Sequence, residues 1–192
     1  MGVVETVAGL GYLLQKIFLL VAEGNESIAG RRWRIAGWIA YLIGAPMWVT
    51  IFYLESNLIL LFVEGGGIPS IVLGLIIAIR DRGKAPEWLN TLAIFMTFVG
   101  IAISLYSFGG LMTLSQILEL GVAVGFLVGT YFLAKRNSNG WLWYLLMNGS
   151  AGTLMGIQGY PFLTIQQAFS FAIVAIAYGK AIRSQRHLKA TP

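Results

Sequence analysis

Seven apolar segments follow one another along the chain, each about as long as the roughly 20 residues that an α-helix needs to cross a bilayer. Short charged or glycine-rich breaks separate them, and they cover approximately residues 3–22, 35–54, 58–79, 89–108, 111–134, 141–157 and 162–182. Hydrophobic residues make up 57% of the chain and charged residues only 11%, a balance foreign to soluble domains. We therefore expect an all-α membrane protein with seven transmembrane helices.

Lysine and arginine fall on only one side of this topology. Their clusters begin at Arg31, Arg80, Lys135 and Lys180, after the first, third, fifth and seventh segments. The opposite connections, at 55–57, 109–110 and 159–161, carry no positive charge. Because positively charged loops stay in the cytoplasm, we expect a multi-pass protein of the inner or plasma membrane with its amino terminus outside and its carboxyl terminus in the cytoplasm.

Several classes of function lack the residues that they need. The chain has no cysteine, and its one histidine, His187, lies in a basic tail. It also has no HExxH motif, nucleophile elbow or pair of catalytic carboxylates. We expect no enzyme activity, cofactor or metal site. The net charge of +5 comes from basic residues scattered between apolar segments, which indicates topology signals and not a nucleic-acid partner.

An internal repeat relates the second and third segments to the sixth and seventh. A shift of 103 positions aligns Trp38 with Trp141 and Tyr41 with Tyr144, and basic residues precede the tryptophan in both copies. Chance similarity between apolar segments is the alternative explanation, although the matches agree with the topology. Internal repeats are typical of transporters.

The repeat predicts three helices, a linking helix and three more helices. We expect the first repeat at 1–80, the linking transmembrane helix at 81–110, and the second repeat with its basic tail at 111–192. One crossing between the repeats makes them parallel, so the binding site should lie between them.

Aromatic and amide side chains form a stripe on each repeat, because residues three, four or seven positions apart share a helix face. Such stripes suit a flat solute, on which rings stack and which amides orient. Amides that join helices and aromatic residues at the membrane interface are the alternative reading. The candidate solute-binding residues with a ring or a carboxamide are Trp38, Tyr41, Trp48, Trp141, Tyr144, Asn148, Gln158, Gln166 and Gln167.

Three charged residues lie inside predicted membrane segments. Glu64 precedes three glycines and Pro69, where we expect the third helix to bend or open, and it is a further candidate for solute binding. Lys16 and Glu119 occupy positions that we relate through the repeat. An ion pair between them and extension of Lys16 toward the cytoplasmic surface are both open at this point.

The region with Trp141, Tyr144, Asn148, Gln166 and the Gln-Gly-Tyr triplet at 158–160 resembles the signature of PnuC-type vitamin transporters, whose best-known members carry nicotinamide riboside. The plan of three, one and three helices is also similar to that of the SWEET sugar transporters. The PnuC family often has Trp-x-x-Trp where this chain has Trp-Leu-Trp-Tyr at 141–144.

The resemblance implies facilitated uptake of a vitamin or nucleoside by alternating access, with intracellular phosphorylation trapping the solute, and a homotrimer in the lipid bilayer. It implies that Trp141 and Tyr144 stack on the solute and that Asn148, Gln158 and Gln166 bond to it. Nicotinamide riboside is the favoured solute, and thiamine and riboflavin are alternatives. A membrane scaffold or sensor that does not transport is the alternative from another class.

Overall fold

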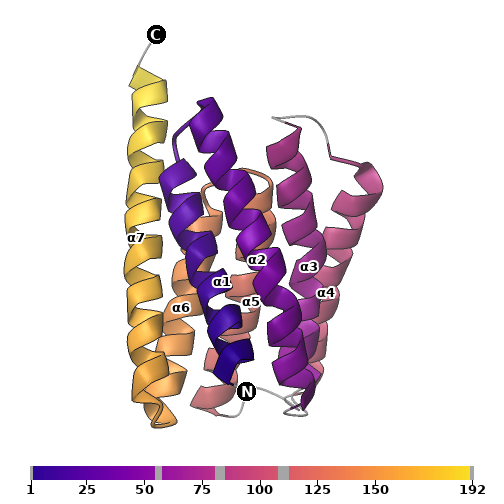
Figure 1. The fold of residues 1–192 in the computed structure, drawn as a ribbon. Helices are drawn as coiled ribbons and strands as arrows, with labels where there is room; N and C mark the ends of the chain where they lie inside the picture. Colours follow the sequence, from indigo (N-terminus) through magenta and orange to yellow (C-terminus); the bar gives the residue numbers. More distant parts are fainter. Residues whose placement is uncertain (1, 55–57, 81–84, 108–112, 191–192) are drawn as a thin grey trace.

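The protein is described by a computed structural model that covers residues 2–54, 58–80, 85–107 and 113–190. Within these ranges it is all-helical (Figure 1). The helices in chain order are α1 (Gly2–Ala22), α2 (Ile28–Leu54), α3 (Leu58–Ile79), α4 (Glu87–Ser107), α5 (Leu114–Ala134), α6 (Gly140–Ile157) and α7 (Pro161–Ala190). Each predicted apolar segment corresponds to one of them.

The helices form a closed ring with one helix outside it. α2 packs against α1 and α3, and α6 packs against α5 and α7. The two groups of three, which we call the first group (α1–α3) and the second group (α5–α7), meet where α3 contacts α5 and where α7 contacts α1. α4 lies outside, against α3 and α5 (Figure 1). The interior of the ring is therefore bounded by both groups.

Apolar side chains cover much of the outer surface. Phe95 and Phe98 on α4 and Phe162 and Phe169 on α7 are between 60% and 78% exposed. In the described part of the chain, five helices (α2, α3, α4, α5 and α7) are long and apolar enough to cross a membrane. A large exposed apolar surface is costly in water and favourable in lipid, so these helices indicate a multi-pass membrane protein.

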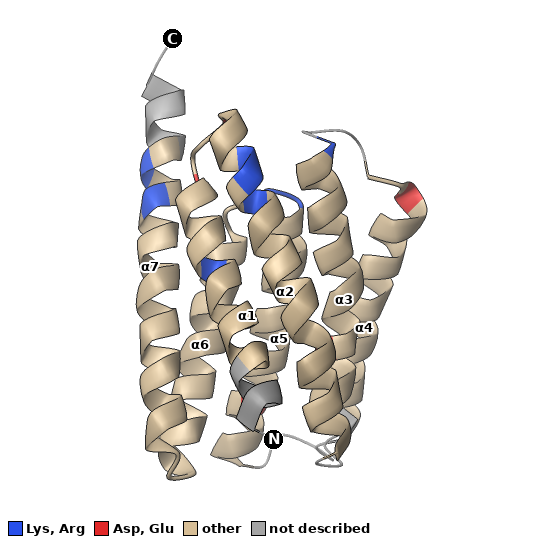
Figure 2. Cartoon of the chain, viewed as in Figure 1, with Lys and Arg blue, Asp and Glu red and all other residues tan. Residues whose placement is uncertain are grey.

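Basic side chains gather at one end of the bundle (Figure 2). This basic end contains the α1–α2 and α5–α6 connections, the end of α3 and the carboxyl-terminal half of α7. Lys16 is the exception among the described lysines and arginines, because it is fully buried within α1, six residues before the helix ends at Ala22.

The expectation that α3 opens at its glycines is wrong. Residues 64–70 are continuously helical, with Pro69 inside the helix. The glycines instead allow neighbouring helices to approach α3. A Cβ atom at Gly66 would lie 3.2 Å from the Met96 carbonyl oxygen on α4, and one at Gly67 would lie 2.6 Å from the Phe126 ring on α5. Close packing explains these residues without a break in the helix.

Candidate functional site

A cavity of about 230 Å³ lies between the two groups at the basic end. Its walls come from α1, α2 and α3 of the first group, from α5, α6 and α7 of the second, and from the α1–α2 and α5–α6 connections. Trp38 and Trp141, the pair that the repeat relates, both line it. A concave site between structural units is the usual location of a small-molecule site.

Trp38 owes its position to a glycine on the neighbouring helix. The indole is 2% exposed and packs against α3 at Gly74, where an added Cβ atom would lie 2.5 Å from the ring. Any side chain at Gly74 would therefore collide with Trp38. The close contact of α2 with α3 fixes the orientation of the indole at the cavity.

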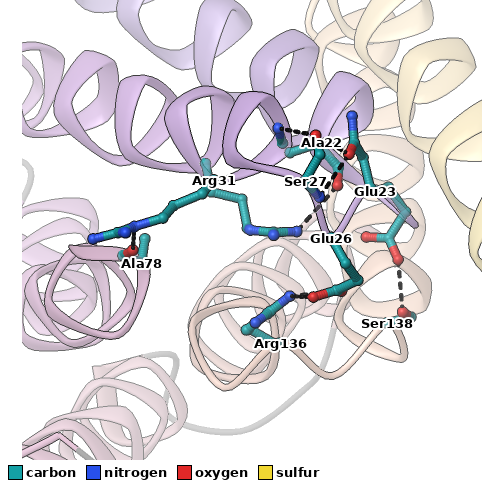
Figure 3. Close-up of polar contacts among 11 residues, drawn as sticks. Ala22, Glu23, Glu26, Ser27, Arg31, Ala78, Arg136 and Ser138 are labelled. Atoms are coloured by element: carbon teal, nitrogen blue, oxygen red, sulfur yellow. Dashed lines mark hydrogen bonds and ion pairs between the residues drawn. The ribbon is translucent and has the colours of Figure 1, made fainter. Parts of the chain in front are cut away.

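Trp141 is held by a carboxylate from the other group. Its Nε1 atom donates a hydrogen bond of 2.8 Å to Glu23, which also accepts one of 2.9 Å from the Ser138 hydroxyl. Figure 3 shows Glu23 and Ser138 facing each other across the two connections. Glu23 thus joins the α1–α2 connection to the beginning of α6.

A second link between the same connections is more exposed. Arg136 and Glu26 form an ion pair with an N–O distance of 2.6 Å (Figure 3). The Glu26 side chain is 55% exposed, so solvent screens the pair and its contribution to stability is small, about 0–1 kcal/mol. Arg136 has a φ of 58°, in the left-handed region, at the tight turn between α5 and α6.

Two tyrosines lie one helical turn deeper than the tryptophans. Tyr41 and Tyr144 are both fully buried. The Tyr41 hydroxyl donates to Glu64 Oε1 on α3 at 2.5 Å, and the Tyr144 hydroxyl is 2.9 Å from Thr130 Oγ1 on α5. The predicted residues Trp38, Tyr41, Trp141 and Tyr144 therefore all point into the interior of the ring.

Lys16 and Asn148 meet in this deeper layer. Lys16 Nζ donates to Asn148 Oδ1 at 2.7 Å and lies 3.8 Å from the centre of the Tyr12 ring. The Asn148 Nδ2 atom donates to the Tyr144 carbonyl oxygen at 2.6 Å. Lys16 is fully buried, so it neither extends to the surface nor has Glu119 as its bonding partner.

Tyr12 and Gln15 also belong to this layer, although sequence analysis did not single them out. The Tyr12 hydroxyl contacts Met147 Sδ at 2.8 Å, and its ring lies 5.6 Å from that of Tyr41. Gln15 is fully buried beside the Tyr144 hydroxyl, but its carboxamide forms no hydrogen bond of normal geometry with a described residue. The spacing of Tyr12, Gln15 and Lys16 on one helix face was the available signal.

We call this layer the central polar cluster. Its members have a polar side chain that is buried or, for Tyr12, partly buried, and they come from five of the six helices of the ring. They are Tyr12, Gln15, Lys16, Tyr41, Glu64, Thr130, Tyr144 and Asn148.

Four predicted residues lie elsewhere. Trp48 is half-buried and stacks on Phe52, with ring centres 5.4 Å apart. Gln158 is exposed at the end of α6. Gln166 lies against Gly9 on α1, and Gln167 lies against Gly152 on α6. The structure does not bring these four side chains to the cavity, because they are nearer the opposite end of the bundle.

The chain matches no known protein family, no curated protein and no solved structure. Within the described ranges, no group of three histidine, aspartate or glutamate side chains is placed to hold a metal ion.

Proposed function

We propose that the protein is a carrier that takes up a flat vitamin or nucleoside-like solute by alternating access, as the resemblance to PnuC-type transporters implies. The observation that carries this proposal is the cavity between the two groups, to which each group contributes one buried tryptophan. Two indoles can stack on a planar ring, and the polar groups beneath them can orient it.

Helix packing supports two repeats of three helices. Gly37 of α2 packs against Leu19 of α1, and Gly140 of α6 packs in the same way against Leu133 of α5. The connection between paired helices also agrees: α2 ends at Leu54 and α3 begins at Leu58, while α6 and α7 have these boundaries 103 positions later.

The packing favours a different shift for α1 and α5 than the predicted shift of 103. Gly37 and Gly140 are 103 positions apart, whereas the leucines that they contact, Leu19 and Leu133, are 114 apart. With the larger shift, Lys16 corresponds to Thr130 and not to Glu119. The difference arises because α2 has additional helical residues before Gly37, whereas α6 begins at Gly140.

The distribution of charge supports an orientation for the carrier. The basic end would face the cytoplasm, because positively charged segments are retained there. The cavity is at this end, so it would form the cytoplasmic part of the solute path. The second group would then release solute past Trp141 and Arg136, which both line the cavity.

A thermal-shift panel with nicotinamide riboside, thiamine and riboflavin tests solute binding on the purified protein. We expect one solute to raise the melting temperature, and Trp141→Ala and Trp38→Ala to abolish the shift. Trp88→Ala is the matched control, because Trp88 is 67% exposed on α4. If Trp88→Ala abolishes the shift in melting temperature and the two cavity variants keep it, the proposed site is wrong.

Solute counterflow in liposomes then separates a carrier from a sensor. A carrier exchanges labelled solute across the membrane, whereas a sensor or scaffold binds without exchange. If the solute that shifts the melting temperature shows no counterflow, the transport function is wrong even though the site exists.

A further inference from the structure

The central polar cluster contains one cation and one carboxylate that do not pair. Lys16 is fully buried and Glu64 is 8% exposed. The contacts of Lys16 are with a neutral amide and a ring face, and Glu64 accepts its hydrogen bond from a neutral hydroxyl. No ion pair within the described residues involves either side chain.

The groups around Glu64 offer few alternatives for neutralising it. On α2 it faces Tyr41, and the tyrosines Tyr12 on α1 and Tyr144 on α6 are also close enough to interact with it electrostatically. None of the described titratable side chains on the other helices packed against α3 bonds to it. These side chains are Glu87 and Tyr106 on α4 and Glu119 and Tyr131 on α5.

A buried carboxylate without a counter-ion is costly, so it binds either a proton or a cation. The nearest cation along the chain of contacts is Lys16, which reaches Glu64 through the rings of Tyr12 and Tyr41. A ring face and an amide oxygen stabilise the ammonium without removing its charge. The central polar cluster therefore holds a cation and a carboxylate on the same group of helices, and these two side chains do not form an ion pair.

The amide that bonds to Lys16 and the carboxylate that Lys16 does not contact belong to different groups. Asn148 lies on α6 of the second group, whereas Lys16 and Glu64 lie on α1 and α3 of the first. If the groups move apart during alternating access, Lys16 loses Asn148 but stays in the same group as Glu64, from which the rings of Tyr12 and Tyr41 separate it here. The partner that Lys16 selects thus depends on whether the groups are joined.

We propose that Glu64 is a proton-binding site of the carrier and that the Lys16 ammonium neutralises the Glu64 carboxylate after the proton has left. With the groups joined, as here, the carboxyl group of Glu64 carries the proton and Lys16 bonds to Asn148. When the groups separate, the O–H bond of Glu64 breaks, the proton passes to water in the opened interface, and the Lys16 ammonium pairs with the carboxylate. The total charge of the protein falls by one in this step.

This inference rests on the proposed carrier function, because it needs two groups that move. It adds a proton-linked step to uptake and is compatible with trapping of the solute by phosphorylation. High proton concentration favours the joined groups, and low proton concentration favours the separated groups, since protonation stabilises the state that binds the proton.

The absence of cysteine from the chain permits a test that needs no solute. Spin labels on Ile28→Cys and Asn139→Cys report the distance between the first and second groups at the basic end. Ile28 is 73% exposed, and Asn139 forms no side-chain cap on α6, so both sites tolerate a label. Electron–electron resonance then gives the distance distribution in lipid nanodiscs.

We expect two populations that differ in the distance between the two labels. The ratio of the separated to the joined population should rise at least about tenfold from about pH 5 to about pH 9, a range that spans the titration of buried carboxylates. Glu64→Gln, a neutral isostere, should hold the joined distance throughout. Glu64→Asp keeps a titratable group and should retain the response, which covers a failure of the glutamine variant to fold. Lys16→Gln should lose the response because no cation remains to replace the proton.

Glu119→Gln is the matched control. It removes the glutamate of α5, which lies outside the central polar cluster, and should leave the response intact. A pH-independent distance in the wild type, or an undiminished response in Glu64→Gln, would overturn the inference. A solute that still binds and exchanges in that case would show that the carrier function stands without the proton site. Conversely, a response in a protein that exchanges no panel solute would support the proton site and contradict the proposed solute class.

Discussion

Lys16 on α1 donates a hydrogen bond of 2.7 Å to Asn148 on α6, and this bond joins the two groups at the centre of the ring. Both side chains are almost completely buried. A charged hydrogen bond at such a site contributes more than a bond at the surface, and the loss of one partner leaves the other unsatisfied. The stability of the interface between the two groups therefore depends on this pair.

Asn148→Ala should lower the free energy of unfolding by about 2–4 kcal/mol, because it leaves the Lys16 ammonium without its amide partner. Thermal unfolding in detergent measures the loss. Thr153→Ala on the same helix is the control, since Thr153 is exposed and bonds only to the Gly149 carbonyl. Equal melting temperatures for the Asn148 variant and the control would contradict a structural role for the pair.

Gly74→Ala should destabilise the protein by about 1–3 kcal/mol and weaken solute binding, because the new methyl group would displace the Trp38 indole. The added Cβ atom would lie 2.5 Å from the ring. Gly65→Ala on the same helix is the matched control, because nothing lies within 4 Å of its Cβ position. That variant should be neutral or slightly stabilising, by up to about 1 kcal/mol, since alanine favours helix. Denaturation of both variants in parallel gives the comparison.

Glu23→Ala should weaken solute binding about 3- to 10-fold, because Trp141 loses its hydrogen-bond acceptor at the cavity. Glu23→Gln keeps an acceptor oxygen and should show a smaller effect. Tryptophan fluorescence reports the change in the surroundings of Trp141, and ligand titration measures the change in solute affinity. Glu26→Gln removes the exposed ion pair with Arg136 and should leave binding within about twofold of the wild type. A larger effect from Glu26 than from Glu23 would count against this assignment.

Gln15→Leu should raise the free energy of unfolding by about 1–2 kcal/mol, because it replaces a buried carboxamide that forms no hydrogen bond of normal geometry with a described residue. The same change should reduce solute binding if the carboxamide is held in place for a solute. Ser70→Ala offers a control for stability, since the buried Ser70 hydroxyl also has no hydrogen-bond partner among the described residues but lies outside the cluster. Stabilisation in both variants, with binding lost only in Gln15→Leu, is the expected pattern.

Much of the helical layout could be predicted from hydropathy. The predicted segment 58–79 coincides with α3, and the predicted segment 141–157 differs from α6 by one residue. α2 begins at Ile28, seven residues before its predicted start, because the RRWR sequence at 31–34 interrupts the apolar signal without interrupting the helix. Hydropathy identifies the part of a helix that suits lipid and not the turns beyond it.

The inward faces were easier to predict than the contacts between them. Trp38, Tyr41, Trp141 and Tyr144 share helical periodicity, which a sequence displays directly. The bond between Lys16 and Asn148 joins residues 132 positions apart, and no local pattern encodes such a pairing. The similar packing of α1 on α2 and of α5 on α6 is equally hard to predict, because Gly37 and Gly140 are 103 positions apart whereas Leu19 and Leu133, which they contact, are 114 apart.

α2 begins nine residues before Gly37, whereas α6 begins at Gly140 itself, so the two groups are unequal at the basic end. Arg34 in this extension of α2 lines the cavity on the side of the first group, and Arg136 and Ser138 in the turn between α5 and α6 line it on the side of the second. A turn tolerates insertions and substitutions better than a packed helix does. We therefore expect the wall of the cavity formed by the second group to accept more sequence change than the wall formed by the first.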